Sequence, residues 1–96
     1  MPRPRLGRQI RFSPQVTFFK PRGIPIRDLQ VIELTNEELE ALRLKNVEGF
    51  DQNQCAEKMD TSQSTFQRIL SSANYKISYA IMNGMAIMIE KENEKK

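Results

Sequence analysis

Small polar side chains gather at the start of one predicted helix, and their types suit the edges of DNA bases. Gln63, Ser64 and Gln67 have the spacing to lie on one side of a helix, opposite its apolar stripe. Glutamine can pair with adenine through two hydrogen bonds, and serine can contact several bases. We therefore predict these three as base contacts, with Ser62 and Arg68 contacting phosphates. The whole set predicted to bind DNA in this segment is Ser62, Gln63, Ser64, Thr65, Gln67, Arg68 and Ser71.

A helix-turn-helix over residues 51–73 would hold this set in place. A short first helix is followed by a tight break at Asp60 and Thr61. Ser62 has the chemistry of an N-cap, since its hydroxyl can accept a hydrogen bond from a backbone N–H of the next turn. The second helix then starts with slim polar side chains, as a major-groove reader requires, before its apolar stripe begins at Phe66. An ordinary pair of packed helices is the alternative interpretation.

A basic arm precedes this segment. The first 27 residues hold seven basic side chains and no acid, whereas the other 69 residues hold eight basic and twelve acidic ones, a balance of −4. Prolines alternate with the first arginines, which favours an extended chain over residues 1–11. Such an arm could follow a DNA groove through Arg3, Arg5 and Arg8, or it could be a solubilising tail.

The side-chain inventory argues against catalysis. The chain has no histidine and a single cysteine, Cys55, so it offers no internal disulfide, no histidine base and no zinc set. We expect a protein that is not an enzyme, with no cofactor, no metal and no membrane span. The N-terminal segment lacks the apolar core of a signal peptide, so we expect a cytoplasmic location. Cys55 is expected in the core, with a reactive role as the alternative.

Apolar periodicity predicts a fold that is mainly α, with short extended segments in the N-terminal part and at the C-terminus. Residues 12–34 should form short strands around a Pro/Gly loop, with 16–19 extended and 29–34 either extended or a helical turn. Ile24 and Ile26 should anchor that loop to the core. The helix-turn-helix domain with its C-terminal strand should occupy 35–89, and the charged tail 90–96 should be disordered.

Three helices should build that domain. The first begins with a Thr35–Glu38 capping box, stops at Gly49 and buries Leu39, Leu42 and Val47. The second covers roughly 52–59. The third covers roughly 63–83 and holds no acid, while Arg68 and Lys76 are basic. Its apolar stripe is Phe66, Ile69, Leu70, Ala73, Ile77, Ala80 and Ile81.

The end of the third helix carries a second row of large side chains, Tyr75, Tyr79 and Met82. The row could pack on the Phe18–Phe19 segment or form the surface of a homodimer or higher homo-oligomer, which would help so small a domain. The apolar run 85–89 should be a strand buried on both faces, paired with residues 16–19 or with another subunit.

Four segments of the chain together resemble a small prokaryotic family of predicted DNA-binding proteins, catalogued as domain of unknown function one-three-four. They are MPRPR at 1–5, FFKPRGIP at 18–25, LTNEELEALRL at 34–44 and MDTSQSTFQRIL at 59–70. The helical part is similar to the fourth region of sigma factors, whose helix-turn-helix reads promoter elements. The resemblance implies sequence-specific binding of double-stranded DNA. Asp60 stands where the family pattern leads us to expect glycine.

The leading hypothesis is therefore a DNA-binding transcriptional regulator that uses the helix-turn-helix and the basic arm. The main alternative is a protein–protein adaptor that keeps the helical fold but has lost DNA contact. RNA binding through the arm is a third possibility, and it would show as a preference for RNA over duplex DNA.

Overall fold

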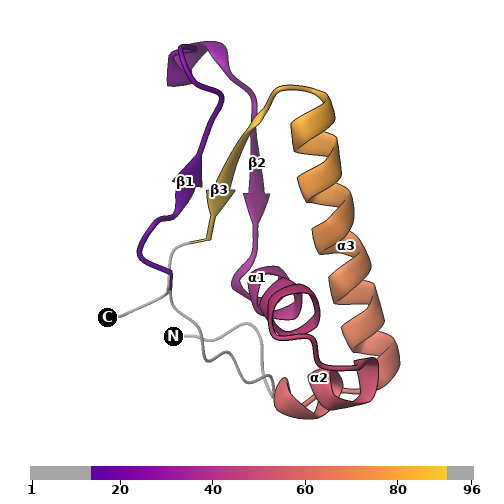
Figure 1. Cartoon of the computed structure of the whole chain (residues 1–96). Helices are drawn as coiled ribbons and strands as arrows, with labels where there is room; N and C mark the ends of the chain where they lie inside the picture. The colour runs from indigo at the N-terminus through magenta and orange to yellow at the C-terminus, as the bar shows by residue number, and fades with distance from the viewer. Residues whose placement is uncertain (1–13, 91–96) are drawn as a thin grey trace, which may run out of the picture.

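The computed structural model describes residues 14–90, which form three helices and a small three-stranded sheet (Figure 1). The predicted arm, with Arg3, Arg5 and Arg8, and the predicted tail from residue 91 lie outside the described residues. The strands are β1 (Phe18–Phe19), β2 (Val31–Leu34) and β3 (Ala86–Ile89), and the helices are α1 (Asn36–Leu42), α2 (Gln52–Lys58) and α3 (Gln63–Met82). A 3-10 turn covers Ile26–Asp28, and a π-helical turn covers Arg43–Val47.

The sheet has the order β1-β3-β2, with β3 in the centre. β1 pairs with β3 in antiparallel register, Phe18 opposite Met88, which confirms the predicted pairing with residues 16–19. β2 is a strand rather than a helical turn, and it pairs with β3 in parallel, Leu34 opposite Ile89. Parallel neighbours need a long crossover, and the three helices supply it. Figure 1 shows that α3, the last helix of this crossover, runs beside the sheet.

Among residues 14–90, a helix covers one face of the sheet. Leu34 and Ile89 point to that face and pack with Ala73 of α3 in one buried cluster. On the other face, Met88 is 36% exposed. The prediction that this strand is buried on both faces was therefore wrong at Met88. Ile24, with Ile26, was also predicted to anchor the preceding loop, but both side chains are exposed.

The first helix starts as predicted and then changes its winding. Thr35 and Glu38 form the predicted capping box, with the Thr35 hydroxyl accepting from the Glu38 amide at 3.1 Å and the Glu38 carboxylate accepting from the Thr35 amide at 2.9 Å. After Leu42 the chain enters the π-helical turn, which holds more residues per turn and shifts the face that each side chain occupies. Val47 is consequently 77% exposed, against the prediction, and the segment ends at Gly49 with a positive φ of 81°.

The main core lies where the three helices meet, and its largest buried side chain is Phe66 of α3. Cys55 belongs to this core, as predicted, and burial raises the pKa of its thiol. The buried members are Ala41, Leu44, Cys55, Ala56, Met59, Phe66 and Leu70. The predicted stripe of α3 is buried or half-buried along its length except at Ile81, which is 65% exposed near the end of the helix. No helix in the described part of the chain is long and apolar enough to cross a membrane.

Candidate nucleic-acid interface

α2 and α3 are joined by a break that local hydrogen bonds define. Asp51 caps α2 by accepting from the Gln54 amide at 2.8 Å. α2 ends at Lys58, and Asp60 then adopts a positive φ of 57°. Ser62 caps α3, since its hydroxyl accepts from the Thr65 amide at 3.1 Å. The predicted break and the predicted N-cap are both confirmed.

The first half of α3 presents polar side chains to solvent. Phe66 and Leu70 are buried on the opposite side against α1 and α2. Six of the seven predicted side chains in this segment are exposed: Ser62, Gln63, Ser64, Gln67, Arg68 and Ser71. Thr65, the seventh, is half-buried. The structure therefore brings the set together on one side of one helix.

The hydrogen bonds within this exposed set are local. Gln67 donates to the Ser71 hydroxyl at 3.2 Å, and Arg68 donates to the Thr65 hydroxyl at 3.4 Å. The Ser62 hydroxyl also lies 3.0 Å from that of Thr65. Because these bonds join exposed neighbours, they can be exchanged for bonds to a ligand at little cost, since water competes for them already.

Two residues of α2 join the set, and the sequence interpretation missed them. Gln63 donates from its side-chain amide to the Asn53 side-chain oxygen, and Gln52 donates to the Gln63 carbonyl at 3.4 Å. These contacts orient Gln63 from the neighbouring helix. The sequence offered one signal for these two residues, the polar run at 51–54. Capping of α2 uses Asp51 and Gln54 and leaves the two polar side chains between them for another contact.

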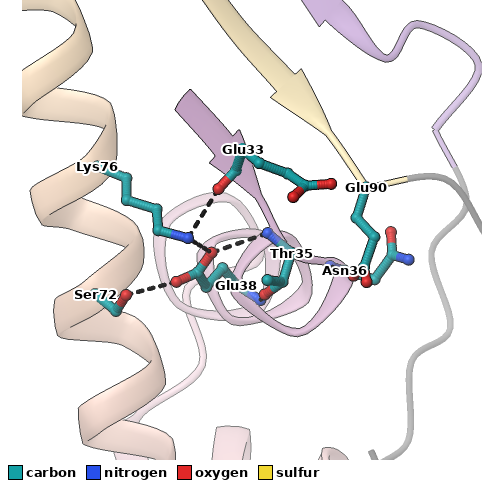
Figure 2. Close-up of polar contacts among 7 residues, drawn as sticks. All are labelled: Glu33, Thr35, Asn36, Glu38, Ser72, Lys76 and Glu90. Carbon is teal, nitrogen blue, oxygen red and sulfur yellow. Dashed lines mark hydrogen bonds and ion pairs between the residues drawn. The ribbon is translucent and has the colours of Figure 1, made fainter. Parts of the chain in front are cut away.

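Lys76, counted with Arg68 as a basic residue of the third helix, has its charge paired inside the protein. Its ammonium group donates to the Glu38 carboxylate at 2.9 Å and to the Glu33 carbonyl at 2.8 Å (Figure 2). Arg68, in contrast, is exposed, and its guanidinium donates to the uncharged Thr65 hydroxyl. Of the two basic residues of α3, Arg68 is therefore the one available to a phosphate.

Glu38 connects the cap of α1 to the middle of α3. Its carboxylate accepts from the Ser72 hydroxyl at 2.5 Å as well as from Lys76 and the Thr35 amide (Figure 2). Burial raises the pKa of this carboxyl, but the hydrogen bonds from Ser72, Thr35 and Lys76 and the charge of Lys76 outweigh burial, so the pKa is lowered overall. The charged carboxylate thus fixes the position of α3 relative to α1.

A separate hollow of about 310 Å³ lies beside the π-helical turn. Its two carboxylates and two cations balance: Arg43 contacts Glu40 at 2.9 Å and Glu48 at 3.2 Å, and Lys58 lies 4.7 Å from the centre of the Phe50 ring. This balance favours no ligand of either charge. Within residues 14–90, no group of three or more His, Cys, Asp or Glu side chains is placed to hold a metal ion.

The comparison with known proteins covers the whole chain. The family model described as "Protein of unknown function DUF134" matches residues 1–96. A UPF0251 protein of Caldanaerobacter subterraneus subsp. tengcongensis is 52% identical over 95 residues, which is 99% of this chain and 80% of that protein. A UPF0251 protein of Moorella thermoacetica is 50% identical over 90 residues, which is 94% of this chain but only 60% of that protein. No solved structure matches the chain. With its full length matched and half of its residues shared with these relatives, the chain belongs to the DUF134 family.

Proposed function

We propose that this protein binds double-stranded DNA sequence-specifically and acts as a cytoplasmic transcriptional regulator, with α2 and α3 forming a helix-turn-helix. The observation that carries the proposal is the first half of α3. Its outward side is slim, polar and exposed, while Phe66 and Leu70 fix its back to the core. A helix of this kind fits the major groove of B-DNA, where hydrogen-bonding side chains at its N-terminal end reach base edges.

The contacts within the site support separate roles for its members. Gln63, Ser64 and Gln67 would contact bases, with Asn53 holding the Gln63 amide in position before DNA arrives. Ser62 and Arg68 would contact phosphates. Thr65 is half-buried and bonded to both of these side chains, so its role is to position them, and Ser71 would extend the contact surface.

The charge of the site predicts where the affinity comes from. Phosphate contacts by lysine and arginine release counterions and supply most of the affinity of such complexes. α3 has Arg68 for this purpose, since Lys76 is paired with Glu38. The helical part alone should therefore bind weakly, and Arg3, Arg5 and Arg8 of the N-terminal arm should supply the rest.

The proposal is tested by fluorescence anisotropy with a random-sequence DNA duplex pool across a salt series. The full chain is compared with a deletion of residues 2–8 and with Gln63→Ala. We expect affinity to fall steeply with salt, and the deletion to cost more affinity than Gln63→Ala. The deletion should also lower the log–log salt slope by about 0.9 for each phosphate that the arm neutralises in the full chain. No binding by the full chain at low salt would overturn the proposal.

The pairing of Lys76 with Glu38 favours a second candidate, because it leaves α3 a single exposed basic residue. In that case the same helical face would contact another protein, and the chain would be an adaptor. Salt-sensitive DNA binding separates the two candidates. A matched titration with RNA would show whether the arm prefers RNA, which exposes its 2′-hydroxyls to such contacts.

A further inference from the structure

The outward side of α3 changes character halfway along the helix. Steps of three or four residues keep side chains on one side of a helix, and they lead from Ser64 through Arg68 and Ser71 to Tyr75, Tyr79 and Met82. The first three members are polar. The last three are large and mostly apolar, and we call them the tyrosine row.

The tyrosine row is open to solvent. Tyr75 is 64% exposed, Tyr79 is 44% exposed and Met82 is 79% exposed. Of the two alternatives for the row, this exposure argues against packing on Phe18 and Phe19 and leaves the surface of a homo-oligomer. The two tyrosine rings stack with their centroids 5.5 Å apart and their planes at 27°. The two rings thus form one continuous aromatic surface, and the exposed Met82 follows Tyr79 by three residues on the same side of the helix.

The part of α3 around the row carries no outward charge. From Ile69 to Asn83 the sequence contains one charged residue, Lys76, and its ammonium group is turned inward to Glu38 and the Glu33 carbonyl (Figure 2). A charged partner would find no counter-charge on this stretch. An uncharged surface can meet an identical copy without repulsion, which a two-fold interface requires. Tyrosine and methionine are also enriched at protein interfaces, while charged side chains are depleted at their cores.

We propose that the tyrosine row binds the tyrosine row of a second copy of this chain. In an antiparallel pair of α3 helices, Tyr79 lies at the centre of the row and faces its own counterpart, while Tyr75 faces Met82 of the second copy. The row is about 10 Å long at 1.5 Å per residue. So short a contact buries less than a permanent dimer does, and the dimer forms reversibly with rising concentration.

The dimer leaves the first half of α3 free in both copies. Residues 63–71 lie on the N-terminal side of the row, so the contact between Tyr75, Tyr79 and Met82 of the two copies does not use them. If the proposed DNA binding holds, the dimer fits a duplex with two-fold symmetric half-sites. The dimer itself stands without that function, because its evidence is the surface of α3 alone.

The test is sedimentation velocity without DNA, over a concentration series, with the full chain and two charge variants. Tyr79→Glu and Tyr79→Lys place like charges face to face in the proposed dimer, and both residues favour a helix. We expect each variant alone to associate at least about ten-fold more weakly than the unchanged chain. An equimolar mixture of the two variants should regain association, because the opposite charges then meet.

Ile81→Glu is the matched control. Ile81 is exposed on the same turn, but a separation of two residues turns it to another side of the helix, so this variant should associate like the unchanged chain. The proposal is overturned if the unchanged chain stays monomeric at every concentration. It is also overturned if the Tyr79 variants associate normally, or if their mixture associates no better than either variant alone. Circular dichroism of each variant verifies that α3 is retained.

Discussion

Ser71 and Ser72 are neighbours on α3, yet their hydroxyl groups serve different parts of the molecule. Ser71 is exposed and accepts from Gln67, one turn earlier on the same helix. Ser72 donates to Glu38, 34 residues earlier in the chain. The residue type is the same, so the direction around the helix decides whether a polar group holds the fold or remains available to a ligand.

The two basic residues of α3 repeat this contrast. Arg68 is exposed and bonds to a hydroxyl of the preceding turn, whereas Lys76 joins β2 and α1 through the Glu33 carbonyl and the Glu38 carboxylate. We call the contacts around Glu38 the inner polar cluster and the exposed polar side chains between Ser62 and Ser71 the outer polar face. Substitutions in the cluster should change stability, and substitutions on the face should change binding.

The largest effect should come from the carboxylate of the inner polar cluster. Glu38→Gln keeps the size of the side chain but removes the charge that Ser72, Lys76 and the Thr35 amide bind. Hydrogen bonds to a charged group contribute more than neutral ones, and we expect a loss of about 2–3 kcal/mol in the free energy of unfolding. Urea denaturation measures it. The exposed Glu57→Gln is the control and should change stability by less than about 0.5 kcal/mol.

Acid should weaken the same cluster. The pKa of Glu38 is lowered from its ordinary value of 4.5, since the hydrogen bonds and the charge of Lys76 outweigh burial. The folded state therefore favours the charged carboxylate, whose contribution is complete above that ordinary value and is lost as the pH falls through the lower folded value. Urea midpoints from neutral pH to about pH 3 should fall further for the unchanged chain than for Glu38→Gln. Parallel curves for the two proteins would contradict this assignment.

The adjacent serines allow the most direct comparison. Ser72→Ala removes a donor to a nearly buried carboxylate and should cost about 1–2 kcal/mol of stability. Ser71→Ala removes an exposed hydroxyl and should cost less than about 0.5 kcal/mol. Both variants introduce the same residue into the same helix, so helix propensity cancels in their difference. Equal unfolding midpoints would show that the Ser72–Glu38 contact adds nothing to the fold.

When DNA binding is measured instead of stability, we expect a change at Arg68 and none at Lys76. If Arg68 contacts a phosphate as proposed, Arg68→Gln should lower the log–log salt slope of DNA binding by about 0.9 and leave stability unchanged. Lys76→Gln should lower stability and leave that slope unchanged. A lower slope for Lys76→Gln alone would place DNA on the inner polar cluster and reverse the assignment.

Apart from the pairing of residues 16–19 with the C-terminal strand, the features predicted correctly from the sequence were mostly those that neighbouring residues determine. The Thr35–Glu38 capping box and the Ser62 cap each depend on residues three positions apart, and the structure confirms them. The parallel pairing of β2 with β3 joins segments about 55 residues apart, and no turn between them signals it. The partner of Lys76 is set by the same long-range packing. The sequence therefore identified Lys76 as a basic residue of the third helix but did not predict that its side chain turns inward.

The smallest effect should come from the turn that leads into the outer polar face. Asp60 has a φ of 57°, a left-handed conformation that glycine adopts without strain and other L-residues adopt at a cost. Asp60→Gly should raise stability by up to about 1 kcal/mol, with part of the gain offset by greater freedom of the unfolded chain. Asp60→Val should lower stability, because a β-branched side chain is poorly tolerated at this φ. Urea denaturation of both variants measures these opposite shifts. Two unchanged midpoints would mean that the turn does not impose this backbone on residue 60, and Ser62 would then have to set the start of α3 by itself.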